Sequence, residues 1–308
     1  MSKLPKVLFI VGQTASGKTA LAIALAKQFN GAIINADSRQ VYKKMNILTA
    51  KPLRDPNNTR SEYLVEGIKH YLIDICDPGK TFTLADFKKQ AQEAIKEILE
   101  HGQLPIIVGG TGLYIWSLVD NLDIPAIAPN KKLRDSLEEK SLADLVKLLK
   151  NNDPQTAEKI DLKNKRRVLR ALEVSLSSGE SFAKQATKSD FIYDSLQIGL
   201  RWHRAEIFKR IEHRIDEQIK NGALEETKKL LKDYPINLPS LTSIGYKQIG
   251  AFLKGECSLE EAVAQFKRDT RHYAKRQETW FKRDDRIQWI EKNDTEMAVK
   301  LVKVFLKK

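Results

Sequence analysis

The chain has 308 residues, of which 42% are hydrophobic and 30% charged, and its net charge is +13. This composition excludes a disordered tail, and the longest apolar runs are too short to cross a bilayer. The two cysteines, Cys76 and Cys257, make no paired metal spacing, so we expect reduced thiols in a cytoplasmic protein and no structural zinc. The positive charge favours a polyanionic partner such as nucleic acid, although a basic surface kept for solubility would look the same.

The first part of the sequence alternates short strand-like runs with helical patterns. Strands are predicted, in chain order, at Val7–Val11, Ala32–Asn35, Tyr71–Ile75 and Pro105–Val108. Helical periodicity is found at Thr19–Phe29 and at Leu84–Glu100. Alternation of this kind is typical of an α/β fold in which a parallel sheet is flanked by helices.

The pattern changes near Trp116, where Lys, Leu and Asp dominate and no strand is predicted. We expect an α-helical insertion domain at residues 116–196, placed between two parts of a core, residues 1–115 and 197–308. The core resumes with a strand at Gln197–Trp202 and is then mostly helical. Its long amphipathic segments are Ala205–Asn221 and Ser258–Arg283. No coiled-coil seam is visible, so we expect a monomer.

A glycine-rich loop connects the first predicted strand to the first predicted helix. Its sequence is Gly12-Gln13-Thr14-Ala15-Ser16-Gly17-Lys18-Thr19. This spacing and context predict a phosphate loop and a P-loop NTPase-like fold, because inward-pointing amides and the helix N-terminus attract anions. Lys18 would meet phosphate oxygens and the Thr19 hydroxyl would hold Mg²⁺, so a bound diphosphate or triphosphate is expected. The alternative is a chance match in a helix-capping loop.

Nucleotide triphosphatases and small-molecule kinases commonly add an acidic residue that ends a later strand and holds the metal. Asp74, near the end of the predicted third strand, is in a suitable position for this role. The turn Asp77-Pro78-Gly79 follows at once, and an ordinary strand-ending turn explains Asp74 equally well. The strand at Pro105–Val108 ends in glycines, so a triphosphatase is possible but not required.

Asp37 follows the second predicted strand. In an open parallel sheet the ligand lies at the carboxyl ends of the strands, so we expect Asp37 near the phosphate loop. A carboxylate beside a bound phosphate is repelled unless it serves a metal or takes up a proton, which favours a functional role. A plain helix N-cap is the alternative.

Several segments, taken together, resemble the bacterial tRNA dimethylallyltransferases, also called isopentenyl transferases. Besides the phosphate loop they are Ala36-Asp37-Ser38-Arg39-Gln40-Val41-Tyr42, His70-Tyr71-Leu72-Ile73-Asp74, Gly109-Gly110-Thr111-Gly112-Leu113-Tyr114, Ile244-Gly245-Tyr246-Lys247-Gln248 and Thr270-Arg271-His272-Tyr273-Ala274-Lys275-Arg276-Gln277. The matches run in order through nearly the whole chain. One departure is Gln13, where the family loop usually has proline, and we expect an altered loop stiffness but no lost chemistry.

The resemblance implies that the phosphate loop holds dimethylallyl diphosphate and that no ATP is cleaved. The N6 amine of the adenosine 3′ of the anticodon, position 37, would attack the allylic carbon, with Asp37 as general base. Lys18, the loop amides, Mg²⁺ at Thr19 and Arg204 would meet the charge of the departing diphosphate. Thr111 would donate a hydrogen bond to the bridging oxygen. The tRNAs concerned would be those that read codons starting with U.

The resemblance also implies an RNA-binding surface, because the acceptor would be the anticodon stem-loop. The residues expected to contact tRNA are Asp37, Ser38, Arg39, Gln40, Thr111, Arg134, Arg166, Arg167, Arg170, Gly245, Tyr246 and Lys247. A solvated helix face is the alternative for the basic run around Arg166. Near the C-terminus, Trp280 and Phe281 are mixed with Lys and Arg, but their helical spacing from Tyr273 and Phe266 favours core packing over base stacking.

Three other functions stay open at this point. A small-molecule kinase would consume ATP and have no need for a basic insertion. An adenylate prenyltransferase would use AMP or ADP as the acceptor and should lack a wide basic surface. A binding module with a degenerate nucleotide site is disfavoured by the intact Gly17-Lys18-Thr19.

Overall fold

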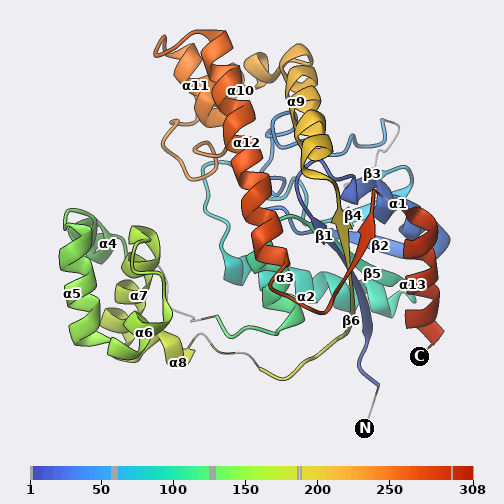
Figure 1. Cartoon of the computed structure of the whole chain (residues 1–308), viewed down its shortest axis with the longest axis horizontal. Helices are drawn as coiled ribbons and strands as arrows, with labels where there is room; N and C mark the ends of the chain where they lie inside the picture. Colours follow the sequence, from blue (N-terminus) through green and yellow to red (C-terminus); the bar gives the residue numbers. More distant parts are fainter. Residues whose placement is uncertain are drawn as a thin grey trace. The chain divides into compact units, whose positions relative to one another are not determined.

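A computed structural model describes residues 3–56, 62–124, 130–185, 187, 189–292 and 294–307 of the chain (Figure 1). The chain forms two compact units, which we call the core unit and the insertion unit. The core unit comprises Met1–Ile115 and Ile192–Lys308, and the insertion unit comprises Trp116–Phe191. Within the described residues, no helix combines the length and the apolar character that a membrane span requires.

A seven-stranded sheet, counted within the described residues, forms the centre of the core unit. Its strands, in spatial order, are β3 (Tyr63–Val65), β4 (Ile68–Tyr71), β2 (Gly31–Asn35), β5 (Leu104–Gly109), β1 (Lys6–Gly12), β6 (Asp194–Arg201) and β7 (Ile287–Glu291). All neighbours pair in parallel except β3 and β4, which form an antiparallel pair. The predicted α/β class with a mainly parallel sheet is therefore confirmed.

Helices cover the sheet because its strands are apolar on both faces, as buried parallel strands are. On one face α1 (Lys18–Gln28) and α13 (Thr295–Lys307) pack on Leu8, Ile10 and Ile198, and Figure 1 shows these two helices side by side. The helix α2 (Leu84–Glu100) packs on β2 and β5 and begins with a capping box between Thr83 and Asp86. The helix α3 (Gly112–Val119) follows β5.

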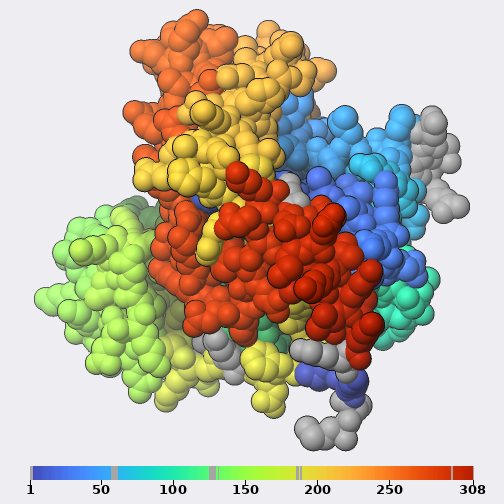
Figure 2. All heavy atoms as spheres, turned by 45° about the vertical axis from the view of Figure 1, so that its right-hand side comes forward, coloured from blue at the N-terminus to red at the C-terminus, as the bar shows by residue number. Residues whose placement is uncertain are grey.

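A second apolar core lies among the later helices of the core unit. These are α9 (Arg204–Lys220), α10 (Ala223–Asp233), α11 (Tyr246–Leu253) and α12 (Leu259–Phe281). Ile207, Ile211 and Ile215 recur every four residues on α9, so they form one buried stripe that packs with Tyr246 and Phe266. The space-filling view shows the C-terminal segments, red, next to α9, yellow (Figure 2).

The insertion unit has its own small helical core, built from Leu145, Leu149, Val168 and Leu172 among others. Its helices are α4 (Lys131–Glu138), α5 (Leu142–Asn152), α6 (Pro154–Lys159), α7 (Lys165–Ser178) and α8 (Phe182–Gln185). Side-chain oxygens cap four of them at the N-terminus, as orphan amides in the first helical turn require. The capping residues are Asn130, Ser141, Asp153 and Asn164.

The structure corrects one predicted strand and adds two that were not predicted. The third predicted strand is placed too late, because β4 ends at Tyr71. Leu72 and Asp74 have positive φ angles of 58° and 59°, a conformation that cannot continue a strand. The short hairpin partner β3 and the edge strand β7 were missed, and β6 begins before the predicted Gln197.

Candidate active site

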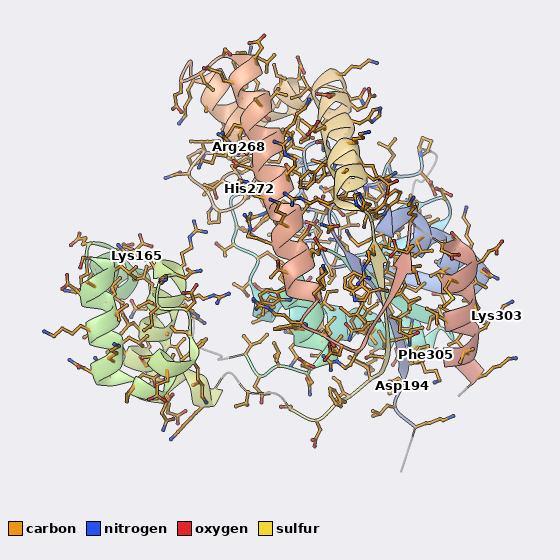
Figure 3. The ribbon with its side chains drawn as sticks, viewed as in Figure 1. Lys165, Asp194, Arg268, His272, Lys303 and Phe305 are labelled. Atoms are coloured by element: carbon orange, nitrogen blue, oxygen red, sulfur yellow. The ribbon has the colours of Figure 1, made fainter. Side chains whose placement is uncertain are left out.

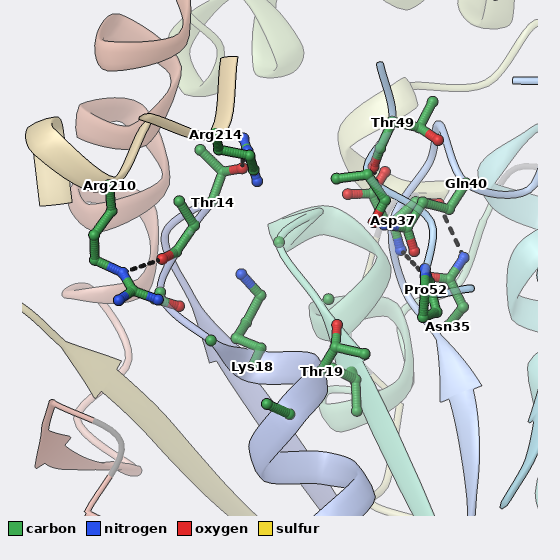
Figure 4. A pocket seen from close by; sticks show the side chains of 18 of the residues that line it. Thr14, Lys18, Thr19, Asn35, Asp37, Gln40, Thr49, Pro52, Arg210 and Arg214 are labelled. Carbon is green, nitrogen blue, oxygen red and sulfur yellow. Dashed lines mark hydrogen bonds between the residues drawn. The ribbon is translucent and has the colours of Figure 1, made fainter. Parts of the chain in front are cut away.

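Three loops meet at the carboxyl ends of β2, β5 and β1, which are neighbours in the sheet. They are the loop after Asn35, the glycine loop after Gly109 and the phosphate loop after Gly12. A cavity of about 660 Å³ opens there, lined by the phosphate loop, by Asp37 and by the middle of α9 (Figure 4). The cavity thus lies where parallel sheets generally bind ligands.

The phosphate loop turns its carbonyl groups towards protein donors. Lys18 Nζ donates to the carbonyl oxygens of Gly12 (3.1 Å) and Gln13 (2.7 Å). The Trp202 indole donates to the Ser16 carbonyl at 2.9 Å, and Arg210 Nε donates to the Ala15 carbonyl at 2.8 Å. Since these donors hold the carbonyls, and the first amides of α1 have no acceptor within their helix, the loop is suited to an anion.

Lys18 projects into the cavity between the arginines of α9 and the loop of Asp37 (Figure 4). Burial lowers the pKa of its ammonium group to about 8; the Asp37 carboxylate opposes this change and the Arg214 guanidinium adds to it. A bound diphosphate would favour the charged form of Lys18 and would therefore raise its pKa.

Two arginines of α9 were missed by the sequence analysis. Arg214 Nη2 donates to Thr14 Oγ1 at 2.8 Å, while its Nε is buried with no hydrogen-bond partner among the described residues. Arg210 and Arg214 both line the cavity and lie one helical turn apart. Two arginines one turn apart, on a helix directly after β6, were the sequence signal that could have identified them as anion-binding residues. The Nε group therefore leaves one donor of Arg214 for a further acceptor, such as an anion in the cavity.

Arg204, the arginine that the family resemblance singled out, has a different environment. It is exposed at the start of α9, and its guanidinium lies 5.3 Å from the centre of the Phe208 ring. It is not among the residues that line the cavity. In this conformation Arg210 and Arg214 are therefore better placed than Arg204 to hold a diphosphate.

Asp37 is held by its own loop. Its Oδ1 accepts a hydrogen bond from the Arg39 amide at 2.8 Å, and its amide donates to Asn35 Oδ1 at 3.2 Å. Asn35 is anchored in turn by donating to the Leu72 carbonyl at 2.9 Å. The carboxylate lines the same cavity as Lys18 and is within electrostatic range of it. The predicted proximity of Asp37 to the phosphate loop is what the structure shows.

Thr111 is bound directly to the loop of Asp37. The Ser38 amide donates to Thr111 Oγ1 at 3.0 Å, and the Thr111 amide donates to the Ala36 carbonyl at 3.2 Å. A Cβ on Gly109 would lie 2.1 Å from the Ala36 oxygen, so only glycine allows the two loops to approach this closely. Because the Thr111 oxygen accepts from Ser38, its own hydroxyl hydrogen remains available for another acceptor.

Asp74 does not face the cavity. Its Oδ1 forms an ion pair of 2.6 Å with Lys51 Nζ, and the same ammonium also donates to the Tyr42 carbonyl. Neither Asp74 nor Lys51 is among the lining residues. Among the described residues that line the cavity, Asp74 therefore does not supply the metal-binding acid that a kinase would have after β4. Its ion pair with Lys51 instead fixes the loop that follows β2.

The other residues of the Asp37 segment have mixed positions. Gln40 lines the cavity and donates to the carbonyls of Thr49 (3.0 Å) and Ala50 (3.1 Å). Arg39 donates to the Pro239 carbonyl at 2.8 Å, and neither it nor Ser38 lines the cavity. These bonds fix the segment around Asp37, and contact of Ser38, Arg39 and Gln40 with RNA stays a prediction.

Tyr246 requires a correction. Its side chain is completely buried, and its hydroxyl donates to Glu226 Oε1 at 2.6 Å, so it cannot present itself to an RNA on the surface. Burial, with the neighbouring Glu226 carboxylate, raises the pKa of the phenol far above its ordinary value. Gly245 is also buried, with φ at 96°, whereas Lys247 is exposed. Of the residues Gly245, Tyr246 and Lys247, we therefore keep the predicted contact with tRNA for Lys247 alone.

The arginines of the insertion unit divide into two pairs. Arg134 and Arg170 form ion pairs of 2.7 and 2.9 Å with Glu173, which is 1% exposed. Burial alone would raise the pKa of Glu173, but hydrogen bonds from the two guanidinium groups hold it below its ordinary value. Arg166 and Arg167 are exposed. The first pair has a structural role, and the second pair remains the better candidate for RNA contact.

Comparison with known proteins connects this site to a family. The sequence model of the protein family described as IPP transferase matches residues 40–284 of this chain. "tRNA dimethylallyltransferase 2" of Geotalea uraniireducens is 44% identical over 294 residues, which cover 93% of this chain and 92% of the relative. The tRNA dimethylallyltransferase of Acetivibrio thermocellus is 42% identical over 308 residues, covering 97% and 96%.

Solved structures agree with these sequence matches. The crystal structure of the full-length tRNA isopentenylpyrophosphate transferase of Bacillus halodurans has a TM-score of 0.70 at 36% identity and covers 97% of this chain and 94% of its own. A eukaryotic dimethylallyltransferase captured while acting on tRNA has a TM-score of 0.81 at 28% identity, covering 98% and 80%. On this evidence the chain belongs to the IPP transferase family, the tRNA dimethylallyltransferases.

Proposed function

We propose that the cavity transfers a dimethylallyl group from its diphosphate to N6 of adenosine 37 in tRNAs that read codons starting with U. The observation that carries this proposal is the pairing of two groups in one cavity. Lys18, in an anion-binding loop, and the carboxylate of Asp37 line the same space. A leaving diphosphate and an amine that loses a proton require such a pair.

In the proposed reaction the N6 nitrogen attacks C1 of the dimethylallyl group, and the bond from C1 to the diphosphate oxygen breaks. The new N–C bond leaves a positive charge on nitrogen, and Asp37 takes the N6 proton. The negative charge on the departing diphosphate is met by Lys18, Arg210 and Arg214, together with the loop amides. Thr111, whose hydroxyl hydrogen is available beside the Asp37 loop, donates to the bridging oxygen.

Magnesium fits the residues of the phosphate loop. The Thr19 hydroxyl lines the cavity, and the buried Ser16 Oγ has no hydrogen-bond partner among the described residues. Hydroxyl and phosphate oxygens, with water, are the ligands that Mg²⁺ prefers, and the ion commonly needs few protein ligands. The bound ion would neutralise part of the diphosphate charge. We propose Thr19 as its protein ligand.

Each of the two units carries exposed basic residues that RNA could contact. Arg166 and Arg167 are exposed on the insertion unit, and Lys247 and Arg268 are exposed on the core unit, where His272 lies one helical turn from Arg268 on α12 (Figure 3). The charge of the arginine and lysine side chains would be attracted to RNA phosphates with a strong dependence on salt. By contrast, Phe281 of the same helix is a core residue, as the helical spacing predicted, and packs in the interior as Phe266 does, whereas Trp280 is half-buried. A monomer in the cytoplasm remains our expectation.

One assay tests the function against its rivals. The protein is incubated with Mg²⁺, radiolabelled dimethylallyl diphosphate and either an anticodon stem-loop or AMP, and ATP hydrolysis is followed in parallel. We expect label in the RNA and no turnover of ATP. If only AMP were labelled, the acceptor would be an adenylate and not RNA. Rapid ATP cleavage without RNA labelling would favour a kinase or triphosphatase.

A further inference from the structure

Gln277 of α12 connects two of the three loops at the site. It is 5% exposed, its Oε1 accepts from the Thr14 amide at 2.7 Å, and its Nε2 donates to the Gly110 carbonyl at 2.9 Å. One side chain therefore bonds the phosphate loop on one side and the glycine loop on the other. Both ends of the carboxamide have a partner of the required kind, which fixes its orientation.

The residue type at each end of this contact is tightly constrained. A Cβ on Gly110 would lie 2.1 Å from Gln277 Nε2, so the contact needs glycine at that position. A carboxylate at position 277 would set an oxygen against the Gly110 carbonyl, and an apolar side chain would leave the Thr14 amide and the Gly110 oxygen buried without partners. Only a side chain with one donor and one acceptor fits.

The two bonded loops carry the two halves of the reaction. Thr14 belongs to the loop that would hold the diphosphate, and Gly110 directly precedes Thr111, which is bound to the Asp37 loop through the Ser38 amide. The bonds thus form a continuous path from the leaving-group site to the proposed base. Displacement of reacting groups by about 1 Å can cost about 10²-fold in rate, so the spacing of these loops matters for transfer.

Gln13 ties the phosphate loop to the same helix at a second point. It is 6% exposed, and its Nε2 donates to the Ala274 carbonyl at 3.2 Å and to Glu278 Oε2 at 3.4 Å. Ala274, Gln277 and Glu278 lie on one face of α12, since positions three and four apart are neighbours on a helix. This face of α12 therefore holds consecutive residues of the phosphate loop.

We propose that Gln277 is a positioning residue that sets the distance between the diphosphate loop and the loops of Thr111 and Asp37, and that Gln13 supports it. This inference rests on the proposed prenyl transfer. It assigns neither residue a contact with substrate: both act through the loops that they hold.

Three variants and a matched control test the proposal in the full chain. Gln277→Leu removes both bonds, Gln277→Glu keeps the acceptor for Thr14, and Gln13→Ala removes the second tie. The control is Gln265→Leu, because Gln265 is a half-buried glutamine of α12 whose side chain, among the described residues, bonds within its own helix, to Asp269 at 2.8 Å. The kcat and KM for dimethylallyl diphosphate, the Kd for an anticodon stem-loop and the Tm are measured for each.

We expect kcat to fall about 10²-fold in Gln277→Leu and about fivefold in Gln13→Ala. The Kd for RNA should stay within about twofold of the unchanged chain, as expected when the docking surface is untouched. The control should keep its kcat. A kcat of Gln277→Leu equal to that of the control would overturn the proposal.

Gln277→Glu supplies a readout that a purely structural role would not produce. When protonated, the introduced carboxyl group can accept from Thr14 and donate to Gly110 as the carboxamide does, and burial at this position disfavours its charged form. Its kcat relative to the unchanged chain at the same pH should therefore rise as pH falls. A flat ratio, or losses that follow the Tm alone, would contradict the proposal. If the protein without substitutions did not label RNA at all, that result would contradict the proposed function and not the positioning role of Gln277.

Discussion

Arg214 of α9 and Thr14 of the phosphate loop are joined by a hydrogen bond of 2.8 Å from Nη2 to Oγ1. The bond brings a guanidinium group from the second half of the chain to the loop near the N-terminus. Burial lowers the pKa of this guanidinium, and the Asp37 carboxylate acts against that change. The cation is therefore placed in the cavity at a cost in solvation that a bound anion would offset.

The first prediction compares two arginines of the same helix. Arg214→Gln should lower kcat/KM for dimethylallyl diphosphate about 10²-fold, because a preplaced cation is lost where leaving-group charge develops. Arg204→Gln, at an exposed position outside the cavity, should change it less than about threefold. Steady-state kinetics with a stem-loop acceptor measures both. If Arg204→Gln proved the more damaging change, the diphosphate would have to lie nearer the start of α9 than we propose.

The second prediction concerns the proposed base. Asp37→Asn keeps an oxygen that can accept from the Arg39 amide, so the loop should retain its conformation. We expect kcat to fall by about 10²–10⁴-fold, the usual contribution of general acid–base catalysis. The Tm and the Kd for the stem-loop should change little. A parallel loss of RNA affinity and activity would show that Asp37 acts mainly in structure.

The third prediction is a pH dependence of donor binding. Burial lowers the pKa of Lys18 to about 8, and a bound diphosphate must raise it. Below pH 8 the ammonium is already present; above pH 8 binding must take up a proton, so KM for the donor should rise roughly tenfold per pH unit until the pKa of the complex is reached.

The control for this prediction is Lys18→Arg, in which the cation does not titrate in the same range. Its donor affinity should be lower at pH 7 but nearly constant between pH 7 and 9.5. Calorimetry with inorganic diphosphate in buffers of different ionisation enthalpy would measure the proton uptake directly. Absence of any uptake at pH 9 would mean that Lys18 is still charged in the empty site.

The sequence predicted the parts of the site that are local in the chain. The phosphate loop and Asp37 were found because each follows a strand, and the carboxyl ends of neighbouring parallel strands converge. Arg214 was not found, and Gln277 was noted only as part of a segment that resembles the family, since the contacts of both depend on how α9 and α12 pack in the core unit. Such tertiary contacts leave no local pattern beyond the one-turn spacing of Arg210 and Arg214.

The same limit explains the errors. Tyr246 belongs to a segment that resembles the family, and resemblance alone does not distinguish an RNA contact from a core residue. Its burial follows from the packing of α11 on α10 and α12, which the sequence pattern did not reveal. The third strand was placed too late because Leu72 and Ile73 are strand-like in composition, whereas the positive φ angles of Leu72 and Asp74 depend on the turn that they form.

The fourth prediction tests the corrected role of Tyr246. Tyr246→Phe removes the donor to Glu226 but leaves that carboxylate its bonds from the amides of Asn46 and Ile47, each of 2.8 Å. We expect a loss of about 1 kcal/mol in the free energy of unfolding, the usual value of a buried hydrogen bond. The Kd for the stem-loop should be unchanged. If Tyr246→Phe weakened RNA binding without lowering the free energy of unfolding, Tyr246 would have to contact tRNA as the family resemblance implied.

The fifth prediction separates the two arginine pairs of the insertion unit. Replacing Arg166 and Arg167 with alanine should weaken stem-loop binding and reduce the slope of log K against log salt by up to about 2, one unit for each lost phosphate contact. The Tm should hardly change, because both side chains are exposed. Arg170→Ala should instead lower the Tm, since it removes one of the two cations that neutralise the buried Glu173. A salt slope that is the same with and without Arg166 and Arg167 would show that these residues form a solvated helix face, and RNA would then have to be held by the exposed cations of the core unit.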